Sequence, residues 1–241
     1  MLFGTRDPNL QGDVPPGPDD APVNAIVSPD TRRGGIAERT PPHQSRTKKW
    51  PVLDAGGPPQ RLDLKDWRFS LTGLVEESVT FTWDEFRKLP RTKVFADMHC
   101  VTRWSRLGNV WEGVSTRDLL RHVTLKPGVQ FVLISAYDKG FSFRGGATDW
   151  TTNLPLEAFT EEDCLFADTH DGQAIPLEHG GPLRLVIPRL YAWKSAKWVK
   201  GIEFRDTDTP GFWERGGYHM LGDPWKEQRY RFEGEEDSES A

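Results

Sequence analysis

Apolar and polar positions alternate with a period of two along much of the chain after its N-terminal part, which predicts β-strands. Residues 67–71 (Trp-Arg-Phe-Ser-Leu) alternate as in a half-buried strand. Residues 94–100 alternate in the same way, and Cys100 ends this predicted strand on its more apolar face. Further strands are expected at apolar runs bounded by turn residues, at 131–137, 183–187 and 198–204.

Helical signals are short and lie between these strands. Residues 82–85 (Thr-Trp-Asp-Glu) have the spacing of a capping box, and Pro90 ends the apolar pattern behind them. Ser115 begins a second capped segment, whose apolar residues predict a helix that continues up to Pro127. Asp-Gly at 171–172, between two apolar runs, is typical of a hairpin turn. These patterns together predict an α+β fold of mainly mixed or antiparallel sheet with short helices.

Composition divides the chain into three expected parts. Residues 1–45 are rich in Pro, Asp, Gly and Arg without an apolar period, so we expect an extended or partly disordered N-terminal arm. Residues 46–232 carry the patterned segments and are expected to form one catalytic domain, since 241 residues suffice to bury a core without disulfides. Residues 233–241 are predicted to be a frayed acidic tail.

Charge and cysteine content limit the partners and the compartment. The net charge of −5 and a pI near 5.7 favour neither nucleic acid nor an anionic membrane surface as partner. No stretch has the apolar length of a membrane span, and Arg-Arg at 32–33 is not followed by the hydrophobic run of an export signal. A reducing compartment would keep the two cysteines, Cys100 and Cys164, as thiols. We therefore expect a cytoplasmic protein without membrane attachment.

Three sequence blocks carry candidate chemistry. The first is 99–105 (His-Cys-Val-Thr-Arg-Trp-Ser), with Trp-Glu-Gly-Val following at 111–114. The second is 178–188 (Glu-His-Gly-Gly-Pro-Leu-Arg-Leu-Val-Ile-Pro), and the third is 191–199 (Tyr-Ala-Trp-Lys-Ser-Ala-Lys-Trp-Val). In this order the blocks resemble the sulfite oxidase-type molybdopterin-dependent oxidoreductase family. The resemblance is nearest to its short, haem-free bacterial members, which are related to the catalytic subunit of the periplasmic methionine sulfoxide reductase.

This resemblance implies a sulfite oxidase-like molybdopterin-binding domain with molybdenum and molybdopterin as its cofactors. It also implies that Cys100 is the protein ligand of the molybdenum, because the family's ligating cysteine lies in such a first block. The chemistry agrees, since molybdenum favours sulfur and a nearby cation such as Arg103 favours the thiolate. Cys100 and Arg103 are therefore the predicted catalytic residues. Arg106 and Arg189 are further candidates for contacts with substrate oxygen atoms.

The second and third blocks supply most of the predicted cofactor-binding residues. Arg184 offers a planar fork for a phosphate or a pterin carbonyl, and Lys197 offers a compact charge. His179, followed by two glycines, offers a ring nitrogen and accessible backbone amides. Family position places Ser135 beside the pterin. The complete predicted set consists of Cys100, Ser135, His179, Arg184, Ser195, Ala196, Lys197, His43 and Gln44.

Two features of the chain depart from the family pattern. The N-terminal arm lacks the Asn-Asn-aromatic-Tyr-Glu start with which the periplasmic reductases hold the pterin. The candidates to replace it are His43, Gln44, Arg46 and Lys48. The chain also has no room for the haem and dimerisation domains of eukaryotic sulfite oxidases, so a separate electron-transfer partner is expected. Large aromatic residues are predicted to form core and pocket wall rather than an electron relay, namely Trp104, Trp111, Trp193 and Trp198.

Three functions remain open at this point. The leading hypothesis is a molybdenum oxidoreductase that performs oxygen-atom or two-electron transfer on a small sulfur- or nitrogen-containing substrate, sulfite-like or sulfoxide-like. The second is a non-catalytic module that carries or stores molybdopterin. The third is a cysteine hydrolase, which requires Cys100 to form a hydrogen-bonded pair with His99 or His179. The identity of the substrate and the direction of the reaction do not follow from these residues.

Overall fold

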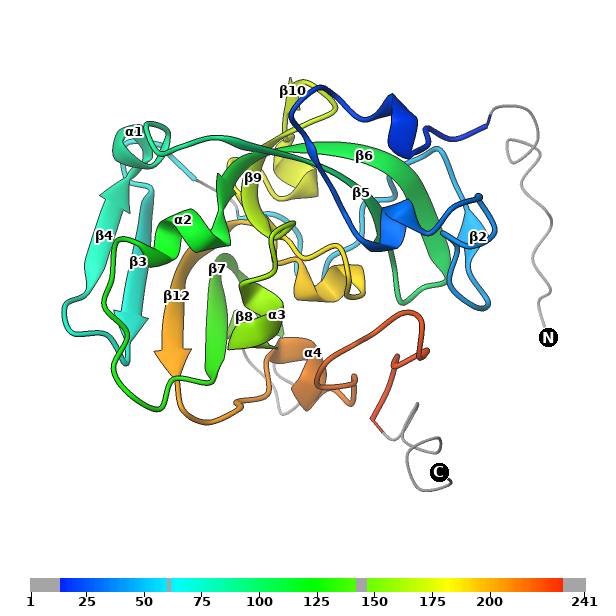
Figure 1. Cartoon of the computed structure of the whole chain (residues 1–241). Coiled ribbons are helices and arrows are strands. Elements are labelled where there is room, and N and C mark those ends of the chain that lie inside the picture. Colours follow the sequence, from blue (N-terminus) through cyan, green and yellow to red (C-terminus); the bar gives the residue numbers. More distant parts are fainter. Residues whose placement is uncertain (1–13, 60–61, 142–146, 232–241) are drawn as a thin grey trace.

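Two β-sheets form the framework of the protein (Figure 1). The computed structural model describes residues 14–59, 62–141 and 147–231. The first sheet has the order β1-β5-β6-β9-β10, with β2 paired to β6 and β11 paired to β9. Its strands are β1 Ile26–Val27, β2 Ser45–Arg46, β5 Thr92–His99, β6 Trp104–Ser115, β9 Leu165–His170, β10 Gln173–Ala174 and β11 Arg184–Val186.

The second sheet has the order β4-β3-β12-β7-β8. Its strands are β3 Arg68–Gly73, β4 Val79–Thr82, β7 Phe131–Phe141, β8 Ala147–Pro155 and β12 Val199–Arg205. Most pairs in both sheets are antiparallel, whereas β1 with β5, β2 with β6 and β3 with β12 are parallel. The predicted α+β class with mixed sheets and short helices is confirmed, as are the strands predicted from apolar patterns.

The helices are as short as their sequence signals suggest. They are α1 Trp83–Phe86, α2 Thr116–Leu120, α3 Leu156–Phe159 and α4 Phe212–Arg215, with 3-10 turns η2 Pro18–Asp20, η3 Asp30–Arg32, η4 Leu177–His179 and η5 Ala192–Lys194. The capping box is present in α1, where the Glu85 amide donates to the Thr82 hydroxyl and the Glu85 carboxylate accepts from the Thr82 amide.

The length predicted for the second helix was wrong. Helix α2 ends at Leu120 rather than continuing to Pro127. Beyond it, the Lys126 amide donates to the Leu74 carbonyl and the Glu76 amide donates to the Thr124 carbonyl. Tertiary hydrogen bonds to residues 74–76 therefore replace the last helical turn. The predicted hairpin turn is confirmed, because Asp171 and Gly172 join β9 to β10 with φ angles of 47° and 77°.

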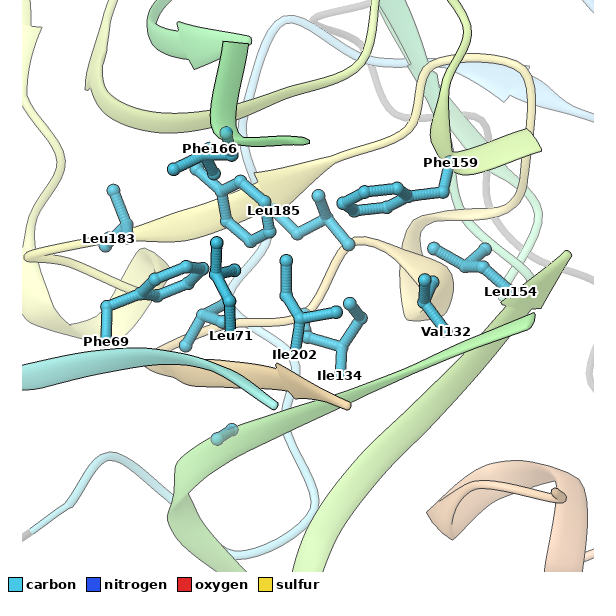
Figure 2. Close-up of a cluster of buried hydrophobic side chains, with 14 of the residues drawn as sticks. Phe69, Leu71, Val132, Ile134, Leu154, Phe159, Phe166, Leu183, Leu185 and Ile202 are labelled. Carbon is cyan, nitrogen blue, oxygen red and sulfur yellow. The ribbon is translucent and has the colours of Figure 1, made fainter. Parts of the chain in front are cut away.

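The main hydrophobic core lies between the two sheets, as Figure 2 shows. Phe69 and Leu71 of β3 and Ile202 of β12 pack toward Phe166 of β9 and Leu185 of β11. Burial of each such side chain stabilises the fold by about 1.5–3 kcal/mol. This core fixes β11 and the segments that follow it, which carry most of the predicted cofactor residues.

Residues 14–46 run along the first sheet and pair with it. Ile26 lies opposite Val94, and Ser45 lies opposite Trp104. Arg39 is fully buried and donates to both oxygens of Asp97, at 2.9 and 2.6 Å. Loss of one partner of a buried pair costs about 3–5 kcal/mol, so this ion pair fastens the arm to β5. The division of the chain at residues 45 and 232 stays a prediction, and the predicted tail 233–241 lies outside the described residues.

Candidate active site

A cavity of about 230 Å³ brings together residues of all three sequence blocks. Its lining includes Cys100 from the first block, His179 and Arg184 from the second, and Ser195 and Lys197 from the third. A larger cavity of about 920 Å³ lies between the N-terminal segment and β6, and it contains none of these five residues. The smaller cavity therefore holds the candidate chemistry.

Cys100 follows β5 in a tight turn. The Cys100 amide donates to the Trp104 carbonyl at 2.8 Å, and the Arg103 amide donates back to the Cys100 carbonyl at 3.0 Å. The turn requires a positive φ of 69° at Arg103, whose side chain is exposed. The Thr102 hydroxyl donates to Cys100 Sγ at 3.2 Å. Burial raises the pKa of the thiol, while the bonds from Thr102 and the charge of Arg229 oppose this shift.

The sulfur has no histidine as its hydrogen-bond partner in the described part of the chain. His99 is buried and its Nδ1 lies 2.9 Å from Ser105 Oγ, and burial lowers the pKa of the ring to about 4. His179 instead stacks on Trp50, with ring centroids 3.8 Å apart. The geometry therefore lacks the thiol–histidine pair that a cysteine hydrolase requires.

Side chains from both ends of the chain hold the peptide that carries Cys100. Gln44 Nε2 donates to the Cys100 carbonyl at 3.1 Å, and Arg229 Nη1 donates to the Val101 carbonyl at 2.7 Å. The Arg229 guanidinium lies over the Tyr191 ring at 4.9 Å from its centroid. Two consecutive carbonyls are thus fixed by residues far away in sequence. Gln44 precedes Cys100 by 56 positions, and Arg229 follows Val101 by 128 positions. The sulfur is held in place by this support.

One side of the cavity is polar, and we call His179, Arg184, Lys197 and Asp138 its polar side. Arg184 Nη1 donates to the His179 carbonyl at 2.8 Å, and Nη2 donates to the Ser195 carbonyl at 3.2 Å. Burial lowers the pKa of Arg184 to about 9. Lys197 Nζ donates to the Glu178 carbonyl at 2.8 Å. Its pKa is lowered to about 8 by burial and then by the charge of Arg184.

Asp138 is a residue of the polar side that the sequence analysis missed. It lies on β7, it is buried, and its Oδ1 has no hydrogen-bond partner among the described residues. Burial raises its pKa to about 7. Ser135 also lies on β7 but does not line this cavity. Its side chain lines a separate cavity on the opposite face of the second sheet, where its Oγ lies 3.5 Å from the Gly201 carbonyl oxygen. The apolar alternation Val132, Ile134, Ala136 continues to position 138, so a signal for Asp138 was present.

The other side is aromatic, and we call Trp104, Trp193, Trp213 and Tyr218 its aromatic side. The Tyr218 ring lies 5.2 Å from Trp193 and 4.9 Å from Trp213, measured between centroids. Cys100 packs in the same cluster. Trp213 and Tyr218 were not among the predicted site residues. Trp104, Trp193 and Trp198 line the cavity as wall, whereas Trp111 is fully buried in the core.

A buried ion pair supports the aromatic side. Lys194 Nζ lies 2.6 Å from Glu214 Oε1, and both side chains are fully buried. Glu214 Oε1 also accepts from Trp193 Nε1 at 2.9 Å. Lys194 donates in addition to the carbonyl and the side-chain oxygen of Asn153, each at 3.0 Å. Because Glu214 lies on α4, this network ties the Trp193 ring to the helix that carries Trp213.

The remaining predicted residues lie outside the cavity lining. His43 is exposed, and its Nδ1 lies 2.8 Å from Glu227 Oε1. Gln44 donates to the Cys100 carbonyl but does not line the cavity. Ala196 is buried beside β11 and accepts from the Leu185 amide at 2.8 Å. The other candidates are placed elsewhere: Arg46, Lys48 and Arg106 at the larger cavity, Arg189 in an ion pair with Glu161, and Arg103 exposed.

The residues present fit a molybdopterin. Its phosphate needs cations, which Arg184 and Lys197 could supply, and Arg184 Nε is buried with no hydrogen-bond partner among the described residues. The amide-like edge of a pterin needs a polar partner, which the unpaired Asp138 oxygen can supply. The described residues contain no cluster of three or more His, Cys, Asp or Glu side chains that could hold a metal. Cys100, a free thiol in the lining, could add one sulfur ligand to those that a bound pterin would provide.

The chain belongs to the family described as oxidoreductase molybdopterin binding domain, whose model matches residues 55–213. It is accordingly a molybdopterin-dependent oxidoreductase with a sulfite oxidase-like fold, as the three blocks predicted. Membership of this family gives no support to the alternative of a non-catalytic molybdopterin carrier.

Three similar proteins illustrate the range of this family. The chain is 42% identical over 203 residues to the uncharacterized oxidoreductase YuiH of Bacillus subtilis, covering 84% of this chain and 98% of that protein. It is 29% identical to the catalytic subunit MsrP of a protein-methionine-sulfoxide reductase from Ralstonia nicotianae, covering 61% and 46%. The sulfane dehydrogenase SoxCD of Paracoccus pantotrophus shares the fold, with a TM-score of 0.52 and 23% identity over 62% of this chain and 40% of that one.

Proposed function

We propose that the cavity holds one molybdenum-molybdopterin through Cys100 and that the protein transfers an oxygen atom, with two electrons, to or from a small sulfur- or nitrogen-containing substrate. One observation carries this proposal: a single cavity joins an immobilised thiol to a buried arginine, Arg184, and a half-buried lysine, Lys197. The different substrates in the names of MsrP and SoxCD support the reaction class without selecting a substrate.

The bound cofactor would supply a metal that changes its oxidation state by two electrons. The residues of the chain would bind the cofactor, orient it and shield it from water. Arg184 and Lys197 hold anionic oxygen atoms, and Asp138 meets the pterin edge. The turn at Cys100, held through its carbonyls, presents the sulfur in one orientation. The aromatic side excludes water next to that sulfur, which strengthens every polar contact inside the cavity.

The electrons require a partner outside this cavity. We propose a separate electron-transfer protein and a small-molecule substrate as the partners. We also propose a cytoplasmic location, which agrees with Cys100 and Cys164 being free thiols. Within the described residues, no helix has the length and apolarity of a membrane span.

Metal analysis of protein made in a molybdenum-replete host tests the proposal most directly. We expect close to one molybdenum and one pterin per chain, together with oxide-dependent reoxidation of a reduced viologen dye. Metal content near zero, in a host shown to load a related enzyme, would contradict the proposal. Full loading without reoxidation by any sulfur or nitrogen oxide would leave the cofactor assignment intact and contradict the reaction.

A further inference from the structure

Trp50 lines the cavity although it belongs to none of the three sequence blocks. It also precedes residues 55–213, which the family model matches. The Thr47 amide donates to a carbonyl of β6 at 2.9 Å, which holds this segment against the first sheet, and Pro51 favours an extended backbone at Trp50. The Trp50 ring packs edge-on against Trp111 in the core, with centroids 5.3 Å apart. The ring is thus fixed in the cavity wall.

The guanidinium of Arg184 lies in a corner between two nearly perpendicular rings. Its Cζ is 5.3 Å from the Trp50 centroid and 5.5 Å from the Trp111 centroid, and the angle between the two ring planes is 82°. A cation over the face of a tryptophan is attracted by the electrons of the ring, and the attraction is stronger where water is excluded. Arg184 is only 3% exposed, so these contacts replace part of its hydration.

These contacts hold the positive charge of Arg184 without neutralising it. Within the described ranges its guanidinium donates to the carbonyls of His179 and Ser195, and its Nε has no acceptor. Burial lowers the pKa of Arg184 to about 9, and no carboxylate in those ranges opposes this shift. Lys197 differs, because its Nζ lies 3.7 Å from Asp54 Oδ2. Arg184 therefore keeps a charge that an anionic ligand in the cavity can meet.

Trp50 also fixes the ring of His179, the second residue of the polar side that it contacts. The two rings are nearly parallel, with an angle of 10° between their planes and 3.8 Å between their centroids. His179 ends η4, and its carbonyl accepts from Arg184 Nη1 at 2.8 Å. One tryptophan ring thus contacts two cavity side chains whose residues are hydrogen-bonded to each other. Loss of the Trp50 ring would release both side chains at once.

We propose, on the basis of the proposed function, that Trp50 is a positioning residue for the cofactor, which holds Arg184 and His179 in the orientation that meets its anionic group. Trp50 acts through these two side chains and takes no part in the transfer of oxygen or electrons. A ring face orients the guanidinium and leaves its charge available to the cofactor. A carboxylate in the same place would orient the guanidinium too, but it would also neutralise the charge.

The experiment compares Trp50→Leu, Trp50→Phe and Trp83→Leu with wild type, all made in a molybdenum-replete host. Trp83 is a matched control, because it is a half-buried tryptophan that does not line the cavity. It packs edge-on against Trp67 at 5.0 Å, and the Arg87 guanidinium lies 5.9 Å from its ring centroid. Replacement of either tryptophan by leucine therefore removes an edge-on ring contact and a contact between an arginine and a ring face.

Molybdenum and pterin content after dialysis is the first measurement. Trp50→Leu should lower cofactor affinity about tenfold, because leucine has no ring face for the guanidinium or the imidazole. Trp50→Phe keeps a ring face and should stay within about threefold of wild type. Trp83→Leu should retain the wild-type content.

The second measurement needs no cofactor. In NMR spectra of the cofactor-free full chain, stacking on Trp50 should displace the ring signals of His179, which are assigned by their loss in His179→Gln. Trp50→Leu should remove this displacement, Trp50→Phe should keep part of it, and Trp83→Leu should leave it unchanged.

Three results would overturn the inference while leaving the proposed function intact, provided that wild type is loaded. They are equal cofactor content in Trp50→Leu and Trp83→Leu, a loss in Trp50→Leu that Trp50→Phe does not restore, and unchanged His179 signals in Trp50→Leu. Wild-type protein that stays empty, in a host shown to load a related enzyme, contradicts the proposed function itself, and the role of Trp50 falls with it.

Discussion

The polar and aromatic sides of the cavity are built by different physical means. The polar side consists of charged groups whose pKa values burial has shifted: to about 9 for Arg184, about 8 for Lys197 and about 7 for Asp138. The aromatic side consists of rings in mutual contact, supported from behind by Lys194 and Glu214. Burial of charged groups is costly unless a partner of opposite charge meets them, so the polar side is suited to the proposed cofactor, whereas the aromatic side presents rings to the cavity and keeps its ion pair behind them.

The largest effect should come from Cys100→Ser, which replaces the sulfur atom that lines the cavity together with both sides. A hydroxyl is a harder and far less acidic ligand than a thiol, so the molybdenum loses its protein sulfur while the side-chain volume barely changes. We expect the visible thiolate-to-molybdenum band to vanish and dye-linked turnover to fall to background. Absorption spectra and activity assays measure both.

Cys164→Ser is the control, because Cys164 is fully buried in the core, where its Sγ lies 3.3 Å from the Ala158 carbonyl. It should keep the band and the turnover. The reverse outcome, with band and turnover surviving Cys100→Ser but lost in Cys164→Ser, would mean that the metal ligand is assigned to the wrong cysteine.

The next effect should be loss of cofactor from variants of the polar side. Charge-assisted hydrogen bonds contribute about 1.5–3 kcal/mol each, so Lys197→Ala should lower cofactor affinity by at least about tenfold. Arg184→Ala should lose more, since it leaves two carbonyls unpaired, those of His179 and Ser195, whereas Lys197→Ala leaves one, that of Glu178. Molybdenum and pterin content after dialysis measures the loss. Arg121→Ala, an exposed change, should retain full content, and equal retention in all three variants would remove both residues from the site.

A smaller, pH-dependent effect should follow from Asp138→Asn. Burial raises the pKa of this carboxyl from 3.8 to about 7, so the folded state holds the proton more tightly than the unfolded state. Its stabilising contribution is fully present below about pH 4 and is lost as the pH rises through about 7. Urea unfolding of cofactor-free protein should therefore show that the variant gains about 1–3 kcal/mol relative to wild type between pH 5 and pH 8.5. A constant difference across this range would contradict a neutral, buried Asp138.

The smallest effect should come from Gln44→Ala, which removes the amide that donates to the Cys100 carbonyl. One neutral hydrogen bond contributes about 1 kcal/mol, which lowers Tm by roughly 2–4 °C in a chain of this size. We expect retained molybdenum and a small shift of the visible band. Gln173→Ala, at an exposed position of β10, should change neither Tm nor band. Complete loss of cofactor from Gln44→Ala would instead give this residue a direct role in binding, as expected of a replacement for the missing N-terminal motif.

The sequence by itself determined the local structure and the chemical inventory. Period-two alternation located the strands, and the box at Thr82 located α1, because both signals depend on neighbours within a few residues. The three blocks identified Cys100, Arg184 and Lys197, since each lies in a distinctive local pattern. The structure brings these residues to one cavity, although their roles there stay predictions.

Only the tertiary structure decided which other side chains meet them. Ser135 and Asp138 lie on one strand, and the alternation separates them onto opposite faces; packing of the second sheet determines which face borders the cavity. Trp213 and Tyr218 lie outside the three blocks and reach Cys100 because α4 is fastened through Glu214 to Lys194. Contacts between segments far apart in sequence depend on long-range packing energies, which no local pattern records.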